Sequence, residues 1–153
     1  MREAAIITPM QVPLLDLRLQ YTPLRDEIRA EFDALADSQS LILGPKVAQL
    51  ESNIARYCGA NHAIGVSSGT DAELVVLMAL GIGAGDTVIT TPYTFFATAG
   101  CISRIGARPV FVDIDPVTYN ISIPALEEAL KKTERVKAII PVHLFGCCAD
   151  MTA

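Results

Sequence analysis

The sequence predicts an α/β protein: a mostly parallel sheet with helices on both faces, preceded by an amino-terminal helical arm. From residue 62 onward, short apolar runs alternate with segments whose apolar residues recur every three or four positions. The apolar runs are nearly continuous, which is typical of strands buried on both faces of a parallel sheet. The expected strands are residues 64–66, 87–91, 109–113 and 137–142.

Three helices are expected between these strands. The first, from Thr70 to Leu80, has Leu74, Leu77 and Met78 on one face. The other two are expected over residues 95–106 and 124–132.

Two further helices are expected before the first strand. The first has apolar residues at helical spacing over residues 24–35, after a turn at residues 21–23, and the second ends at Gly59. We therefore expect two parts: an arm over residues 1–60 that packs on the later domain or on a second subunit, and a sheet domain over residues 61–153.

Composition excludes several classes of protein. The chain has 153 residues, of which 51% are hydrophobic and 19% charged, as in a soluble globular domain. The net charge of −5 and the scattered Lys and Arg residues argue against a nucleic-acid surface. No run of 18 apolar residues and no signal-peptide pattern occurs, so we expect a cytoplasmic protein with no membrane partner.

The four cysteines, Cys58, Cys101, Cys147 and Cys148, follow no metal-ligand spacing. We expect the thiols to be reduced and to bind no metal. A zinc site formed by these cysteines with His62 or His143 is the alternative.

A turn of small residues, Ser67 to Thr70, joins the first expected strand to the helix that follows it. Backbone N–H groups in the first turn of a helix have no intrahelical acceptor, and the helix dipole adds positive potential there, so such a turn can bind phosphate. A plain helix cap at Ser68 or Thr70 is the alternative. The glycine-rich loop at 81–85 follows a helix and precedes a strand, the reverse of a dinucleotide-binding order, and is read as a turn.

Six ordered motifs closely resemble the amino-terminal part of the DegT/DnrJ/EryC1/StrS aminotransferases. They are Ile42-Leu43-Gly44-Pro45, Ser67-Ser68-Gly69-Thr70-Asp71-Ala72, Gly83-Ala84-Gly85-Asp86, Thr94-Phe95-Phe96-Ala97-Thr98, Pro109-Val110-Phe111-Val112-Asp113-Ile114-Asp115 and Pro141-Val142-His143-Leu144-Phe145-Gly146. The resemblance covers residues 12–151. It implies a pyridoxal-phosphate (PLP) enzyme of the aspartate-aminotransferase fold, homodimeric, that passes an amino group from a donor such as glutamate to a nucleotide-linked keto sugar.

The resemblance also implies a cofactor site. Ser68, Gly69, Thr70 and Asp71 would hold the cofactor phosphate, and Phe95 would lie against the pyridine ring. His143 follows the last expected strand, at the edge of the sheet where the cofactor would bind, and we expect its side chain to be packed and hydrogen-bonded.

Some family features are missing or altered. The resemblance places the Schiff-base lysine, and the acidic residue that partners the pyridine nitrogen, beyond residue 153, so no catalytic residue is assigned here. None of the four lysines, Lys46, Lys131, Lys132 and Lys137, follows the family's lysine pattern. Three positions depart from the family's usual residues: Leu50 replaces Phe, Glu73 replaces Leu and Cys147 replaces Gln. We expect Glu73 to reach water at the helix edge.

In the fold that the resemblance implies, seven strands are ordered 3-2-4-5-6-7-1, and this chain supplies strands 1 to 4. The 64–66 strand would then lie away from the other three, without a partner. We therefore expect a large domain that is truncated at its carboxyl end, that does not fold into the family's architecture alone, and that is inactive alone. Two alternatives stay open: a non-catalytic remnant or interaction module, and a sugar dehydratase that uses the amino form of the cofactor.

Overall fold

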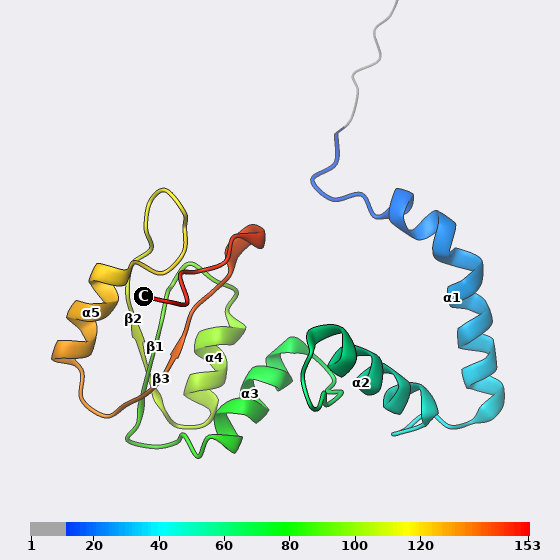
Figure 1. Cartoon of the computed structure of the whole chain (residues 1–153), viewed down its shortest axis with the longest axis horizontal. Coiled ribbons are helices and arrows are strands. Elements are labelled where there is room, and N and C mark those ends of the chain that lie inside the picture. Colours follow the sequence, from blue (N-terminus) through cyan, green and yellow to red (C-terminus); the bar gives the residue numbers. More distant parts are fainter. Residues whose placement is uncertain (1–11) are drawn as a thin grey trace, which may run out of the picture. The chain divides into compact units, whose positions relative to one another are not determined.

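The computed structural model describes residues 12–153 (Figure 1), and the chain divides into two units between Gly65 and Val66. The first unit contains helices α1 (Arg18–Ser38) and α2 (Pro45–Cys58). Neither helix has a buried residue, so the apolar side chains of the arm, such as Phe32, are exposed. Within this unit an ion pair joins Lys46 of α2 to Glu31 of α1.

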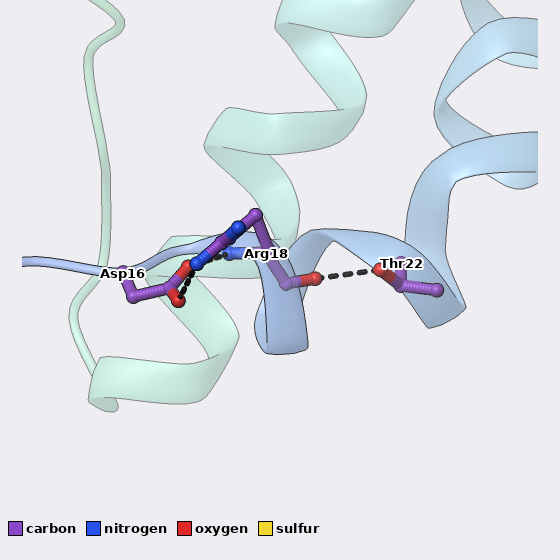
Figure 2. Close-up of polar contacts among 3 residues, drawn as sticks. All are labelled: Asp16, Arg18 and Thr22. Carbon is purple, nitrogen blue, oxygen red and sulfur yellow. Dashed lines mark hydrogen bonds and ion pairs between the residues drawn. The ribbon is translucent and has the colours of Figure 1, made fainter. Parts of the chain in front are cut away.

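Helix α1 begins at Arg18, so the turn expected at residues 21–23 is wrong. Figure 2 shows how its first turn is held: the Asp16 carboxylate accepts hydrogen bonds from the Arg18 backbone N–H at 3.0 Å and from its Nε at 2.9 Å. The Thr22 hydroxyl donates to the Arg18 carbonyl at 2.7 Å. Pro23 lies inside the helix, where it has no N–H to donate to the carbonyl one turn earlier. The guanidinium of Arg18 lowers the pKa of Asp16.

The second unit is an α/β domain with a three-stranded sheet. Its strands are parallel and lie in the order β2-β1-β3. The elements, in chain order, are α3 (Gly69–Ala79), β1 (Thr87–Thr90), α4 (Ala97–Arg104), β2 (Arg108–Phe111), α5 (Ile123–Lys132), β3 (Val136–Ile140) and the 3-10 turn η1 (Leu144–Gly146). The expected fold class is confirmed, and this strand order matches the 3-2-4 part of the order implied by the resemblance.

Helices cover both faces of this sheet (Figure 1). On one face, Val88 of β1 packs in a cluster with Leu77 of α3 and Ile102 of α4. On the other face, the neighbouring Ile89 belongs to a second cluster, against which Leu126 of α5 packs. All four residues of β1 are buried, which explains why its sequence is a continuous rather than an alternating pattern.

The strand expected at residues 64–66 is wrong. Ile64 is 79% exposed, and these residues form no strand. Within the first unit, the Gly65 N–H instead donates to the Glu51 carboxylate at 2.8 Å. A strand needs the backbone groups of a neighbour, and none of residues 12–153 supplies them here.

No helix in the described part of the chain is both long and apolar enough to cross a membrane. The four cysteines are free. Residues 12–153 contain no group of three or more His, Cys, Asp or Glu side chains placed to hold a metal ion.

Helix α3 is capped by Ser68, whose hydroxyl accepts a hydrogen bond from the Asp71 N–H at 3.1 Å. We expect Ser68→Ala to lower the free energy of unfolding by about 1 kcal/mol, because one N–H of the first turn loses its acceptor. Urea unfolding followed by far-ultraviolet circular dichroism measures this. The control is Ser103→Ala on exposed surface of α4, which should change stability by less than about 0.5 kcal/mol. Equal losses in the two variants would contradict the capping role.

Asp86 ties the loop before β1 to the loop before β3. Its carboxylate accepts hydrogen bonds from the Gly83 N–H at 3.1 Å and from Nη2 of Arg135 at 3.0 Å. The hydrogen bond from Arg135, together with that from Gly83, lowers the pKa of Asp86 below its ordinary value of about 3.8.

We expect Asp86→Asn to lower the melting temperature at neutral pH. Because the folded-state pKa of Asp86 is lowered, its contribution is complete well above pH 3.8 and is lost as pH falls through that lowered pKa. The difference between variant and unsubstituted chain should therefore shrink in acid, as thermal unfolding from pH 7 to pH 2 would show. Glu128→Gln removes an exposed ion pair with Lys132 and should have a smaller effect at neutral pH. A difference independent of pH would contradict the role of the Asp86 charge.

Candidate functional site

A cleft of about 450 Å³ lies where the loops that follow β1 and β3 meet the amino terminus of α3. In a parallel sheet these loops leave the carboxyl ends of the strands, the edge at which open α/β sheets bind ligands. All of its lining residues belong to the second unit. They are Gly69, Thr70, Glu73, Thr94, Phe95, Ala97, Thr98, Ile140, Pro141, Val142 and His143.

The first turn of α3 supplies free hydrogen-bond donors to this cleft. The Asp71 N–H donates to Ser68 Oγ and the Ala72 N–H to the Ser68 carbonyl, whereas the N–H groups of Gly69 and Thr70 have no acceptor within residues 12–153. Unpaired N–H groups at the positive end of an eleven-residue helix favour an anion. A Cβ placed on Gly69 would have no atom within 4 Å, so a ligand can approach this backbone closely.

A contact from α4 fixes the position of this turn. The Cys101 thiol, which is fully buried, donates to the Thr70 carbonyl at 3.2 Å. Burial raises the pKa of this thiol, and the neighbouring Glu73 carboxylate raises it further. Cys101 therefore stays a neutral hydrogen-bond donor that links the two helices.

Phe95 forms an apolar wall of the cleft. It lies in the loop between β1 and α4, so the expectation that it lies on a helix is wrong. Its side chain is 79% exposed, as is that of Phe96 at 81%, but Phe96 lines a different pocket, away from the cleft. An exposed aromatic ring beside a helix amino terminus suits a flat, negatively charged ligand.

The remaining polar lining comes from four side chains. The hydroxyls of Thr94 and Thr98 lie 3.2 Å apart and share a hydrogen bond. His143 accepts a hydrogen bond from the Ala149 N–H through Nδ1 at 3.0 Å, which leaves its ring proton on Nε2. Glu73 has one carboxylate oxygen, Oε2, that is buried without a hydrogen-bond partner.

The structure brings three of the five predicted site residues, Gly69, Thr70 and Phe95, to one cleft. The other two lie in the same turn but do not line it: Ser68 caps the helix, and the Asp71 carboxylate accepts a hydrogen bond from Ser67.

Sequence reasoning missed two features of this cleft. Glu73 was expected only to reach water at the helix edge; the half-buried side chain lines the cleft, and its Oε2 is buried. Thr98, the last residue of the Thr94-Phe95-Phe96-Ala97-Thr98 motif, was given no role in the site, yet it lines the cleft.

The model of the DegT/DnrJ/EryC1/StrS aminotransferase family matches residues 23–153. A Geobacillus stearothermophilus protein named pleiotropic regulatory protein is 55% identical over 144 residues, which are 94% of this chain and 38% of that protein. A UDP-N-acetyl-3-dehydro-alpha-D-glucosamine 3-aminotransferase from Acidithiobacillus ferrooxidans is 47% identical over 140 residues, 92% of this chain and 37% of that protein.

The solved structure of NtdA from Bacillus subtilis with bound cofactor PMP is similar to this chain with a TM-score of 0.82 at 34% identity. The match covers 97% of this chain and 34% of NtdA. The chain thus spans less than two fifths of the length of these three relatives. It belongs to the DegT/DnrJ/EryC1/StrS aminotransferase family and corresponds to the amino-terminal part of its members.

Proposed function

We propose that the cleft binds the phosphate and ring of pyridoxal phosphate, and that the whole protein transfers an amino group from an amino acid to a nucleotide-linked keto sugar. The observation that carries this proposal is the pair of unpaired N–H groups at Gly69 and Thr70, which lie in one cleft with the exposed ring of Phe95.

The residues of this cleft fit such a cofactor. The N–H groups of Gly69 and Thr70 and the Thr70 hydroxyl would hold the phosphate at the positive end of α3, and Ser68 and Asp71 would keep that turn closed. The Cys101 thiol would fix the Thr70 carbonyl and so the direction of these donors.

Phe95 would set the plane of the cofactor ring and exclude water from one side of it. Once bound, the cofactor supplies a ring that withdraws electrons from the substrate carbon. The Nε2–H of His143 would offer a hydrogen bond to the ligand from the loop after β3, because its Nδ1 already accepts a hydrogen bond from Ala149.

No lysine lines the cleft within the described part of the chain. We therefore propose that the lysine which binds the cofactor covalently comes from outside these 153 residues, and that the chain alone binds cofactor without turning over substrate. The second candidate function, for the 153-residue chain alone, is therefore that of a module that binds the cofactor but does not catalyse a reaction.

The proposed substrate class is supported by the relatives. The Acidithiobacillus ferrooxidans relative is a 3-aminotransferase named for a UDP-linked keto sugar, and NtdA is solved with bound PMP. We propose the same classes of substrate and cofactor here, with glutamate or a similar amino acid as donor. A homodimer in the cytoplasm is proposed for the whole protein.

We expect Phe95→Ala to weaken pyridoxal phosphate binding about 10-fold, because one face of the ring loses its aromatic partner. Stability should change little, since the Phe95 side chain is already exposed. Equilibrium dialysis of the cofactor against the 153-residue chain measures the dissociation constant.

The matched control is Phe96→Ala, which removes an equally exposed neighbouring ring that does not line the cleft. It should leave the dissociation constant unchanged. Equal weakening by the two substitutions, or no saturable binding by the unsubstituted chain, would contradict the proposed site.

A further inference from the structure

A second pocket, of about 200 Å³, adjoins the cleft at the same edge of the sheet. It is lined from the loop after β1 and from the chain after β3, by Pro92, Tyr93, Thr94, Leu144 and Phe145. Thr94 lines both the pocket and the cleft, and Leu144 directly follows His143 of the cleft. The two hollows therefore lie side by side, and a ligand in the cleft can extend into the pocket.

Aromatic rings open to solvent form the walls of this pocket. Phe145 is 87% exposed and Tyr93 is 46% exposed. The ring of Tyr93 packs against that of Tyr119, with 5.9 Å between the centroids, and this contact restricts how the Tyr93 ring can turn. We call Tyr93 and Phe145, together with Tyr119, the aromatic subsite.

The backbone holds Phe145 in an unfavourable conformation. Its φ is 51°, in the left-handed region that costs free energy for a residue with a Cβ. The Cys147 N–H donates to the Leu144 carbonyl at 3.0 Å and closes the turn around it. The exposed ring gains little from burial to offset this cost. A strained residue with an exposed aromatic ring beside a cleft suggests a role in ligand binding.

The chemistry of the pocket selects the part of a ligand that fits it. None of its five lining residues is charged, so it offers no cation to a phosphate. Its volume is below the roughly 300–1,000 Å³ of sites that hold a whole small ligand, which suits a single ring. The C–H groups on one face of a sugar ring carry partial positive charge and pack against the negative face of an aromatic ring.

The proposed reaction brings a sugar ring to this place. The keto carbon of the substrate must lie beside the cofactor ring, for which Phe95 would be the wall. Phe95 follows Thr94, the residue that the cleft and the pocket share. The sugar is the part of a nucleotide-linked substrate that carries the reacting carbon, whereas the base is separated from it by the phosphates. The sugar ring is therefore the part nearest to the aromatic subsite.

We propose that the aromatic subsite binds the sugar ring of the nucleotide-linked substrate, with Tyr93 and Phe145 as specificity residues that pack against its C–H face. This inference rests on the proposed function, which supplies a sugar that reacts beside Phe95. It separates two aromatic contacts in one site: Phe95 faces the cofactor, and the aromatic subsite faces the substrate.

Binding of UDP-N-acetylglucosamine to the 153-residue chain loaded with pyridoxamine phosphate tests this. This probe has the sugar ring but no keto group, so binding is measured without reaction. UDP is the matched probe without the sugar. Phe145→Ala and Tyr93→Leu each remove one ring of the subsite, and Phe145→Tyr keeps a ring in place. Equilibrium dialysis measures the dissociation constants of both probes and of pyridoxamine phosphate.

We expect Phe145→Ala to weaken binding of UDP-N-acetylglucosamine about 10-fold, because the sugar loses an aromatic face. Tyr93→Leu should weaken it in the same direction, and Phe145→Tyr should retain the affinity. Binding of UDP and of pyridoxamine phosphate should not change in Phe145→Ala. The control is Phe96→Ala, which removes an equally exposed ring that lines neither the cleft nor the pocket and should change none of the three constants.

The two probes separate the sugar from the base. An equal loss for UDP and UDP-N-acetylglucosamine in Phe145→Ala would place the base on this ring and overturn the inference. Unchanged binding in Phe145→Ala would also overturn it, as would a chain that binds pyridoxamine phosphate but not UDP-N-acetylglucosamine, and both results leave the cofactor site intact. Failure of the unsubstituted chain to bind pyridoxamine phosphate would instead overturn the proposed function itself.

Discussion

The position of the cleft depends on one constraint: β1 must be covered on both faces. All four of its residues are buried, with Val88 and Ile89 in clusters on opposite sides of the sheet. α3 and α4 satisfy one side and α5 the other. Because β1 and β3 run parallel, the loops after them leave at the same edge, where α3 begins. The elements that cover β1 therefore also position the residues of the cleft.

The interface between α3 and α4 connects the hydrophobic core to the cleft. Leu77 and Ile102 form its apolar part, and nearer the cleft the contact becomes polar, through the hydrogen bond from Cys101 to the Thr70 carbonyl. The N–H groups of Gly69 and Thr70 in the same turn have no acceptor within residues 12–153, because they lie at the helix amino terminus. The turn is thus held both by its own hydrogen bonds and by a contact from α4, which fixes the positions of its N–H groups.

The sequence predicted most of this domain because its periodicity is strong. The buried pattern of β1, the charged end of α5 at Lys131 and Lys132, and the cap at Ser68 are local signals, and each element formed near its expected place. The 64–66 segment shows the limit of such signals. Its residues favour a strand, but pairing needs a neighbour, and none is present in residues 12–153.

The site was harder to predict than the fold. Gly69, Thr70 and Phe95 could be assigned from motifs, whereas Glu73 looked like a solvent-facing residue on a helix edge. That position becomes part of the cleft wall only because α4 packs against α3. The two helices lie about thirty residues apart in the sequence, as the hydrogen bond from Cys101 to the Thr70 carbonyl shows. Helical spacing alone does not reveal which helix will cover which face.

The most direct test of the account is a titration of the purified 153-residue chain with pyridoxal phosphate, followed by borohydride reduction and mass spectrometry. The cleft has two unpaired N–H groups at the start of α3 and the exposed ring of Phe95, but no lysine among its lining residues. We predict saturable binding of one cofactor per chain that dialysis reverses, with no covalent adduct after reduction. Covalent capture at a single lysine would contradict the assignment of the lysine to sequence outside this chain, and absence of saturable binding would contradict the cleft as the cofactor site.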